Sequence, residues 1–151
     1  MIISLTASVC LVALCFFLHF AVLRRLAAMV GHSGAMVRRP ILKVLFTLFA
    51  LHLVEVSLYA FGIALLDWAR LGSLAGEIAR DEPMLIEYVY FSIASYTTLG
   101  IGDIIPHGGM RIIAGIEALN GLVLITWSAS FTYLTMERFW GTGAVPEETD
   151  A

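Results

Sequence analysis

Long apolar segments and short polar ones follow one another along the chain. Residues 2–23, 41–66 and 110–137 are almost entirely apolar, and each is long enough as a helix to span a bilayer. Residues 84–97 are also moderately apolar, but a helix of that length is too short to span and is typical of a re-entrant segment. The pattern therefore predicts an all-α membrane protein with three transmembrane helices and one re-entrant helix per chain.

The charges between these segments predict how the chain is oriented. Residues 24–43 carry no acidic side chain and several basic ones: Arg24, Arg25, Arg38, Arg39 and Lys43. Glycine and serine residues within this segment indicate a loop, and the positive-inside rule places that loop in the cytoplasm. Residues 67–84 are mildly acidic and predict an extracellular cap. We therefore expect a multi-pass protein of the cell membrane, with the N-terminus outside and the C-terminus in the cytoplasm.

Composition supports a lipid environment and excludes one class of partner. The chain is 60% hydrophobic and 14% charged, with a mean hydropathy of +0.89, which is far more apolar than a soluble domain. A net charge of −3 gives no electrostatic support for binding to nucleic acid. Cys10 and Cys15 would point to different faces of the first helix, so we expect no disulfide between them.

A Thr-Leu-Gly-Ile-Gly-Asp segment occupies residues 98–103, between the re-entrant helix and the last apolar segment. A pore that removes water from a cation needs closely spaced oxygen atoms, which backbone carbonyls supply. Successive carbonyls can face one axis where the backbone alternates between negative and positive φ, and glycine takes positive φ without steric cost. The two glycines are therefore expected at positive φ, with Leu99 and Ile101 at negative φ. The alternative is a simple glycine turn between two helices.

The pattern Thr-x-Gly-x-Gly-Asp resembles the selectivity filter of potassium channels. Residues 90–98 are similar to the family's pore helix, which ends in Thr-Thr, and residues 103–106 match its Asp-x-x-Pro exit. The resemblance implies a homotetramer in lipid, with K⁺ as the permeant ion and no cofactor. It also implies that the filter binds K⁺ through Thr98, Leu99, Gly100 and Ile101, followed by Gly102 at the outer mouth.

The resemblance covers about two thirds of the chain and divides it into three parts. Residues 41–140 correspond to the pore module, in the order outer helix, pore helix, filter and inner helix. Residues 1–40 form an extra N-terminal transmembrane helix and a basic cytoplasmic loop. Residues 141–151 form a short acidic tail, which we expect to be disordered. One filter segment per chain requires four chains to close a ring of carbonyls.

Three residues around the filter are expected to support it. Asp103 would accept a hydrogen bond behind the filter, and Tyr90 lies where the family carries an aromatic donor; the alternative for Asp103 is a solvated loop carboxylate. Ile101 replaces the usual filter tyrosine, and the position of that tyrosine's partner falls on Phe91. We expect apolar packing between these two side chains in place of a polar contact.

Glu117, Asn120 and Gly121 share one face of the last apolar segment. A carboxylate inside a membrane indicates a functional site, and Glu117 is expected to brace the pore helix by a hydrogen bond. Asn120 is a candidate for lining the water-filled cavity, and the alternative is a hydrogen bond between helices. Gly121 is a candidate for a gating hinge or for a small residue that admits close helix packing.

His52 and Glu55 lie one helical turn apart in the second apolar segment. One interpretation is a proton sensor inside the membrane. The other is a buried hydrogen-bonded pair that ties the first helix to the pore module, with His19 as a partner. Two histidines and a glutamate also suggest a metal, although only His52 and Glu55 have ligand-like spacing.

The sequence favours passive conduction of K⁺ and no covalent catalysis. A weakly selective cation channel is the first alternative, because Ile101 replaces the filter tyrosine. A non-conducting tetramer or accessory subunit that uses the same fold is the second. A membrane metalloenzyme using His52, Glu55 and Glu117 is the third, and no substrate-ordering residues accompany that set.

Overall fold

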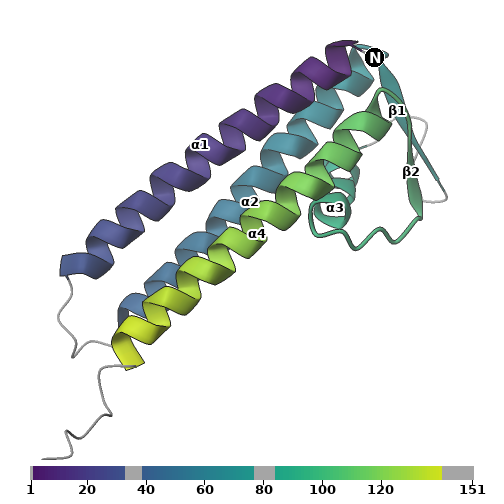
Figure 1. The fold of residues 1–151 in the computed structure, drawn as a ribbon. Coiled ribbons are helices and arrows are strands. Elements are labelled where there is room, and N and C mark those ends of the chain that lie inside the picture. The colour runs from purple at the N-terminus through teal and green to yellow at the C-terminus, as the bar shows by residue number, and fades with distance from the viewer. Residues whose placement is uncertain (1, 33–38, 77–83, 141–151) are drawn as a thin grey trace, which may run out of the picture.

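The computed structural model describes residues 2–32, 39–76 and 84–140. In chain order, its elements are α1 (Ile2–His32), α2 (Arg39–Trp68), β1 (Gly72–Gly76), α3 (Leu85–Tyr96), β2 (Ile104–Gly108) and α4 (Met110–Trp140). The three long helices α1, α2 and α4 run side by side (Figure 1). Each of them is long and apolar enough to cross a membrane. The prediction of three membrane-spanning helices is therefore confirmed.

The long helices extend beyond their predicted limits. α1 continues to His32, past Arg24 and Arg25, and α2 already begins at Arg39, so most of the predicted loop 24–43 is helical. Basic residues lower the hydropathy, but arginine, leucine and alanine are good helix formers, and charge alone does not end a helix. The remaining loop residues 33–38 and the tail 141–151 lie outside the described residues. α4 also runs on to Trp140 rather than ending at residue 137.

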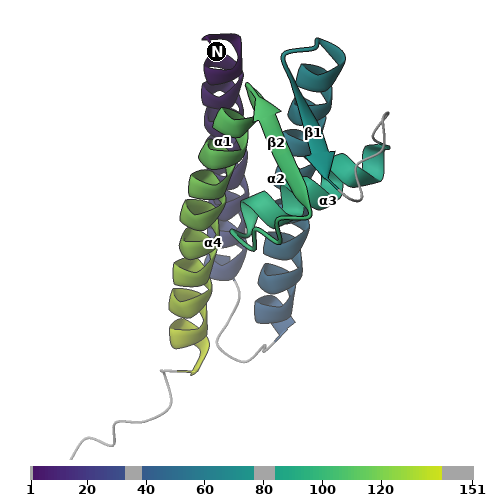
Figure 2. The ribbon, with the colours of Figure 1, turned by 90° about the vertical axis from the view of Figure 1, so that its right-hand side faces the viewer.

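α3 matches the short apolar segment predicted at 84–97 and lies across the long helices rather than along them (Figure 2). α2 ends and α4 begins at the same end of the molecule, with α3 and the loop after it between them (Figure 1). β1 and β2 form a small antiparallel sheet, in which Gly72 pairs with Gly108 and Leu74 with Pro106. The sequence analysis missed this sheet, because two short strands rich in glycine, one with a proline, carry no alternating pattern.

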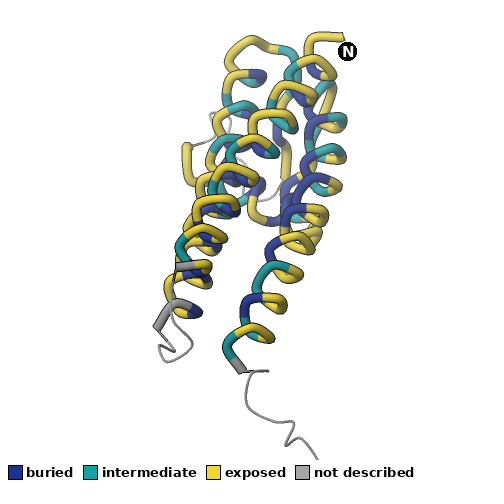
Figure 3. Tube along the Cα trace, turned by 60° about the vertical axis from the view of Figure 1, so that its left-hand side comes forward, coloured by how far each residue is buried: buried dark blue, intermediate teal, exposed yellow. Residues whose placement is uncertain are grey.

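Three apolar cores hold the described elements together, and the third joins all four helices through residues such as Cys15, Tyr96 and Leu124. The first joins α2, α3, both strands and α4 around Ile63, Phe91, Met110 and other side chains. The second joins α1 and α2 through residues such as Leu26 and Leu48, with α4 packed against it. Buried residues follow the inner faces of the helices and exposed ones the outer faces (Figure 3). The outer faces are themselves apolar, as expected for helices in lipid: Phe17 is 76% exposed and Phe46 72% exposed.

Candidate functional site

The segment 98–103 leaves the end of α3 and leads into β2. Gly100 has φ of 53° and Gly102 has φ of 87°, as predicted, whereas Leu99 and Ile101 are not among the residues at positive φ. Thr98 also lies at positive φ, 58°, which the sequence analysis did not predict. Every second residue from 98 to 102 therefore has positive φ, so the backbone alternates along this whole segment.

Thr98 is an unusual residue for this conformation. A β-branched residue at positive φ is a genuine outlier, and such strain costs of order 1–3 kcal/mol. Hydrogen bonds to the last turn of α3 hold the segment: the Thr98 amide donates to the Ser95 carbonyl at 2.9 Å, and the Leu99 amide donates to the Ala94 carbonyl at 2.9 Å. The Gly100 amide donates to the same Ala94 carbonyl at 3.2 Å. The end of α3 thus fixes the conformation of the segment.

The carbonyl oxygens of this segment point away from the hydrogen-bond donors of the described part of the chain. Among the described residues, no hydrogen bond is accepted by a backbone carbonyl of residues 98–101. The side chains of this segment are not packed in a core either, since Leu99 is 65% exposed and Ile101 is 56% exposed. A row of unsatisfied oxygens next to apolar helices requires a ligand, water or further copies of the chain.

Asp103 is held from two sides. The Tyr90 hydroxyl donates to Asp103 Oδ2 at 2.6 Å, and the Ile104 amide donates to Asp103 Oδ1 at 3.0 Å. The predicted contact between Tyr90 and Asp103 is therefore confirmed. The hydrogen bond to the Asp103 carboxylate, with burial as a lesser cause, raises the pKa of Tyr90 above its usual value of 10.0. The pair ties the outer end of the segment to α3.

Phe91 does not pack as the sequence analysis expected. Its side chain is buried in the core formed with Ile63, Ile104 and Met110, and Ile101 is not a member of that core. Phe91 and Ile101 of one chain therefore do not pack in a shared core, because Phe91 faces the junction of α2, β2 and α4.

Tyr88, on the same helix as Phe91, donates a short hydrogen bond to Asp67 at the end of α2.

Glu117 on α4 contacts the pore-helix candidate α3, as predicted, through a short hydrogen bond between its carboxyl group and Ser92. Ser92 Oγ also lies 2.8 Å from the Val56 carbonyl, to which only the Ser92 hydroxyl can donate. Its single proton is then used, so the proton in the second contact belongs to Glu117. Glu117 is fully buried, and its Oε2 has no partner. A neutral carboxylic acid fits this environment, whereas an ionised one would be costly.

Asn120 lies at a small groove between α1 and α4, which Phe16 and Leu119 also line. It is 4% exposed, and its amide donates to the Tyr59 hydroxyl on α2 at 3.0 Å. Of the two interpretations of Asn120, the hydrogen bond between helices is present, and the lining of a water-filled cavity stays a prediction. Gly121 admits close packing: a Cβ atom there would lie 2.1 Å from the Tyr96 carbonyl oxygen of α3. The role of Gly121 as a gating hinge stays a prediction.

His52 and Glu55 belong to a buried polar cluster, which also contains His19, Tyr96 and Ser128. Glu55 Oε1 lies 2.9 Å from His19 Nδ1, and Glu55 Oε2 lies 3.1 Å from His52 Nδ1. The Tyr96 hydroxyl donates to Glu55 Oε2 at 2.6 Å. The predicted link between the first helix and the rest of the chain through His19 is confirmed. The sequence analysis did not find Tyr96, because its contact depends on how α3 is placed against α2.

Ser128 brings α4 into the same cluster. Its Oγ lies 3.0 Å from His52 Nε2 and 3.2 Å from His19 Nε2. Trp127 stacks on the His19 ring with a centroid distance of 5.4 Å. Side chains from all four helices thus meet around the Glu55 carboxylate, and the tyrosine that joins them is the last residue of α3, directly before Thr97 and Thr98.

Comparison with known protein families gives one match. Residues 44–138, well over half of the chain, match the family described as "Ion channel". The matched range includes most of α2, all of α3, the segment 98–103 and nearly all of α4, and it leaves α1 outside. No curated protein and no solved structure matches the chain.

Replacing Gly121 with alanine should destabilise the fold. The added methyl would meet the backbone carbonyl of Tyr96 at 2.1 Å, so α3 and α4 would have to separate. We expect a loss of about 1–3 kcal/mol, as for other overpacked sites, measured as a lower melting temperature of the purified protein. Gly115→Ala is the matched control, because nothing lies within 4 Å of its Cβ position. Equal melting temperatures for both variants would contradict the close approach.

Replacing Glu117 with glutamine should be tolerated. A neutral carboxylic acid that donates to Ser92 is replaced by a neutral amide that can also donate, so we expect a change below about 1 kcal/mol in thermal unfolding. Glu117→Ala removes the donor and leaves a cavity, and it should cost about 2–4 kcal/mol. If the glutamine variant is as unstable as the alanine variant, Glu117 is an ionised residue with a partner of opposite charge.

Replacing Tyr90 with phenylalanine should loosen the outer end of the segment 98–103. The change removes one hydrogen bond to a carboxylate, and the aromatic ring remains. We expect faster amide hydrogen exchange at Ile104 and in the segment 98–103, and little change in α1. Tyr133→Phe is the control, since Tyr133 is exposed on α4. Unchanged exchange in the Tyr90 variant would show that this bond does not hold the segment.

Proposed function

Because the chain belongs to the ion channel family, we propose that it forms a homotetrameric channel that passes K⁺ down its electrochemical gradient. The observation that carries the proposal is the alternation of φ from Thr98 to Gly102, with carbonyls that accept no hydrogen bond from the described residues. Four copies arranged around one axis would close rings of these oxygens. Residues 98–101 would bind the ion, and Gly102 would leave the outer mouth open.

Conduction in this proposal needs no covalent chemistry. Carbonyl oxygens of Thr98, Leu99, Gly100 and Ile101 replace the water shell of K⁺ as it enters, and adjacent sites keep binding weak enough for release. The hydrogen bonds from the amides of this segment to the end of α3 keep the oxygens in place before the ion arrives. The preorganised backbone therefore compensates the cost of dehydration.

The arrangement of charges supports an orientation with the segment 98–103 on the outer side. Arg24, Arg25, Lys43 and Arg138 all lie toward the end of the molecule where α1 and α4 finish and α2 begins (Figure 1). Arg138 also contacts the Gly31 carbonyl at the end of α1, at 3.4 Å. By the positive-inside rule this end faces the cytoplasm, which leaves the N-terminus outside.

Two other functions are possible for this fold, and one experiment separates them from K⁺ conduction. The exposed Ile101, which lies outside the core that holds Phe91, favours a weakly selective cation channel. A non-conducting scaffold would need the same fold and no ion pathway. Reconstitution of the full chain in liposomes, with reversal potentials in opposing K⁺ and Na⁺ solutions, separates the three. A K⁺-selective shift is expected, equal permeability indicates the weakly selective channel, and no flux indicates the scaffold.

Replacing Gly100 with alanine should reduce K⁺ flux several-fold. The residue has φ of 53°, and an L-residue in the left-handed region costs about 1–2 kcal/mol, which the segment would relieve by turning a carbonyl away. No atom lies within 4 Å of the Cβ position in one chain, so the effect is not a clash within the fold. Gly115→Ala is the control and should conduct normally. Normal flux through the Gly100 variant would remove this segment from the ion pathway.

A further inference from the structure

The cluster around Glu55 contains a set of side chains that conduction does not use. His19 from α1, with His52 and Glu55 from α2, place one ligand atom each within 4.8 Å of one another. His19 and Glu55 are fully buried, and His52 is 20% exposed. Two imidazoles and one carboxylate are a ligand set that zinc accepts in proteins, with a fourth position left for water or hydroxide.

A carboxylate buried among membrane helices requires a positive charge beside it. Glu55 accepts a hydrogen bond from Tyr96 and is approached by the Nδ1 atoms of both histidines. In the described residues no lysine or arginine contacts it. If Glu55 is ionised, unlike the neutral Glu117, the charge is carried by the histidines, as an extra proton, or by a cation bound between them.

The hydrogen-bond pattern at Ser128 bears on this choice. If both histidines are neutral and donate from Nδ1 to Glu55, then neither Nε2 atom has a proton. The Ser128 hydroxyl has one proton and can donate to only one of the two Nε2 atoms, although both lie within 3.2 Å. If both Nδ1 atoms instead bind a cation through their lone pairs, both Nε2–H groups donate to Ser128 Oγ, which has two lone pairs. Both contacts are then satisfied by one residue. A doubly protonated histidine would satisfy them as well, with Ser128 donating to the other ring, so the pattern argues only against two neutral rings.

We propose that His19, His52 and Glu55 bind a Zn²⁺ ion inside the membrane-spanning part of each chain. Tetrahedral ligands at zinc distances of about 2.0–2.1 Å lie about 3.4 Å apart, and the two contacts of Glu55 to the Nδ1 atoms measure 2.9 and 3.1 Å. The two contacts use different oxygens of Glu55, and the three ligand atoms all lie within 4.8 Å of one another. With one hydroxide as the fourth ligand, the site is neutral, which suits a low-dielectric environment.

The surroundings of the three ligands fit a metal site. Metal-binding histidines usually donate their second ring nitrogen to a fixed acceptor, and Ser128 Oγ serves both here. A ligating carboxylate is usually oriented by a hydrogen bond, and the Tyr96 hydroxyl supplies it. The stack of Trp127 on His19 fixes the plane of that ring. Each ligand is thus held by a residue that is not itself a ligand.

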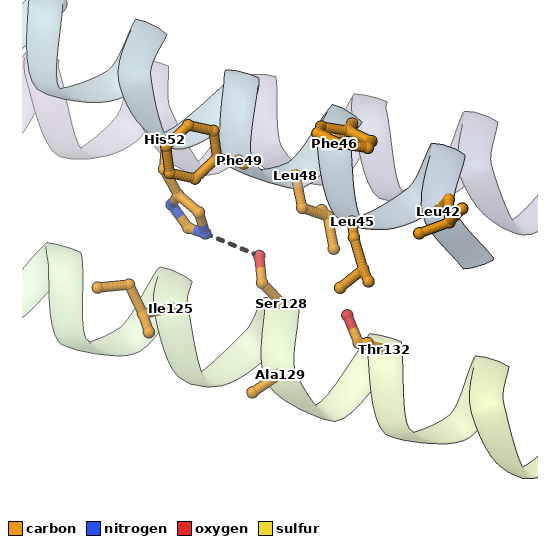
Figure 4. Close-up of a pocket in the computed structure, with 10 residues that line it drawn as sticks. All are labelled: Leu42, Leu45, Phe46, Leu48, Phe49, His52, Ile125, Ser128, Ala129 and Thr132. Carbon is orange, nitrogen blue, oxygen red and sulfur yellow. Dashed lines mark hydrogen bonds between the residues drawn. The ribbon is translucent and has the colours of Figure 1, made fainter.

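Of the three proposed ligands, His52 is the one that lines a groove in the described part of the chain. It lies at the end of a groove of about 590 Å³ between α2 and α4, and Figure 4 shows its ring directed toward Ser128 with the hydrogen bond drawn. The rest of the groove is almost wholly apolar, with Phe46, Phe49 and Ile125 among its lining residues. His52 and Ser128 are therefore its polar end, next to the buried Glu55.

Bound zinc would connect α1 to the structure that holds the filter candidate. His19 is the contribution of α1, whereas Tyr96 is the last residue of α3 and precedes the strained Thr98. Occupancy of the site would therefore fix α1, α2 and the end of α3 relative to one another. This consequence for conduction rests on the proposed channel function, but metal binding itself does not.

The test uses the full chain purified as its native oligomer, stripped with a chelator and then equilibrated with Zn²⁺. We expect one zinc per chain by elemental analysis, a higher melting temperature with zinc, and reversal by the chelator. His19→Ala and Glu55→Gln should lose the metal, and His107→Ala should retain it, because His107 lies exposed on β2. No ion flux is measured, so this result is independent of whether the channel conducts.

A second measurement uses the unaltered protein, so it tests the proposal even if the variants fail to fold. Co²⁺ in place of Zn²⁺ should give the intense visible absorption of a tetrahedral site, and octahedral or absent absorption would overturn the proposal. If an extra proton carries the charge instead, nitrogen NMR shows a histidine ring that is protonated on both nitrogens. A doubly protonated ring in protein that binds no metal, or zinc that persists in His19→Ala, would also overturn it.

Discussion

Polar side chains inside a membrane protein must find partners within the protein, because lipid supplies none. In this chain that constraint decides how the helices are placed. Glu55 lies at the centre, with contacts to His19 on α1 and Tyr96 on α3, and Ser128 on α4 joins through both histidines. Apolar packing in lipid has little directional preference, so these contacts set the rotation of each helix about its axis.

The segment 98–103 depends on that arrangement. Its strained backbone persists because the amides of Thr98, Leu99 and Gly100 are bound by the last turn of α3. That turn is fixed in two ways: Tyr96 is held by Glu55, and the Tyr96 carbonyl approaches α4 at a position where only glycine fits, Gly121. The conformation of a surface loop is thus determined by contacts buried behind it.

The sequence predicted features that depend on local pattern. Hydropathy gave the three long helices and α3, and the chemistry of glycine gave the positive φ of Gly100 and Gly102. Features that depend on distant contacts were missed or left open. The sheet pairs Gly72 with Gly108, and Thr98 takes positive φ because α3 binds the following amides. The choice between cavity and helix contact for Asn120 needed the rotation of α4, which a single apolar segment does not determine.

The family match leaves α1 outside, yet the structure does not support treating α1 as an addition to a self-sufficient pore module. Without His19, the buried Glu55 would lose a close contact, and one face of Ser128 would have no partner. The cost of leaving such groups unpaired in a membrane is several kcal/mol each. The part of the chain that the family matches therefore relies on α1 for buried contacts. Any change in how α1 packs reaches the end of α3 through the Glu55 carboxylate and through the core that Cys15 shares with Tyr96.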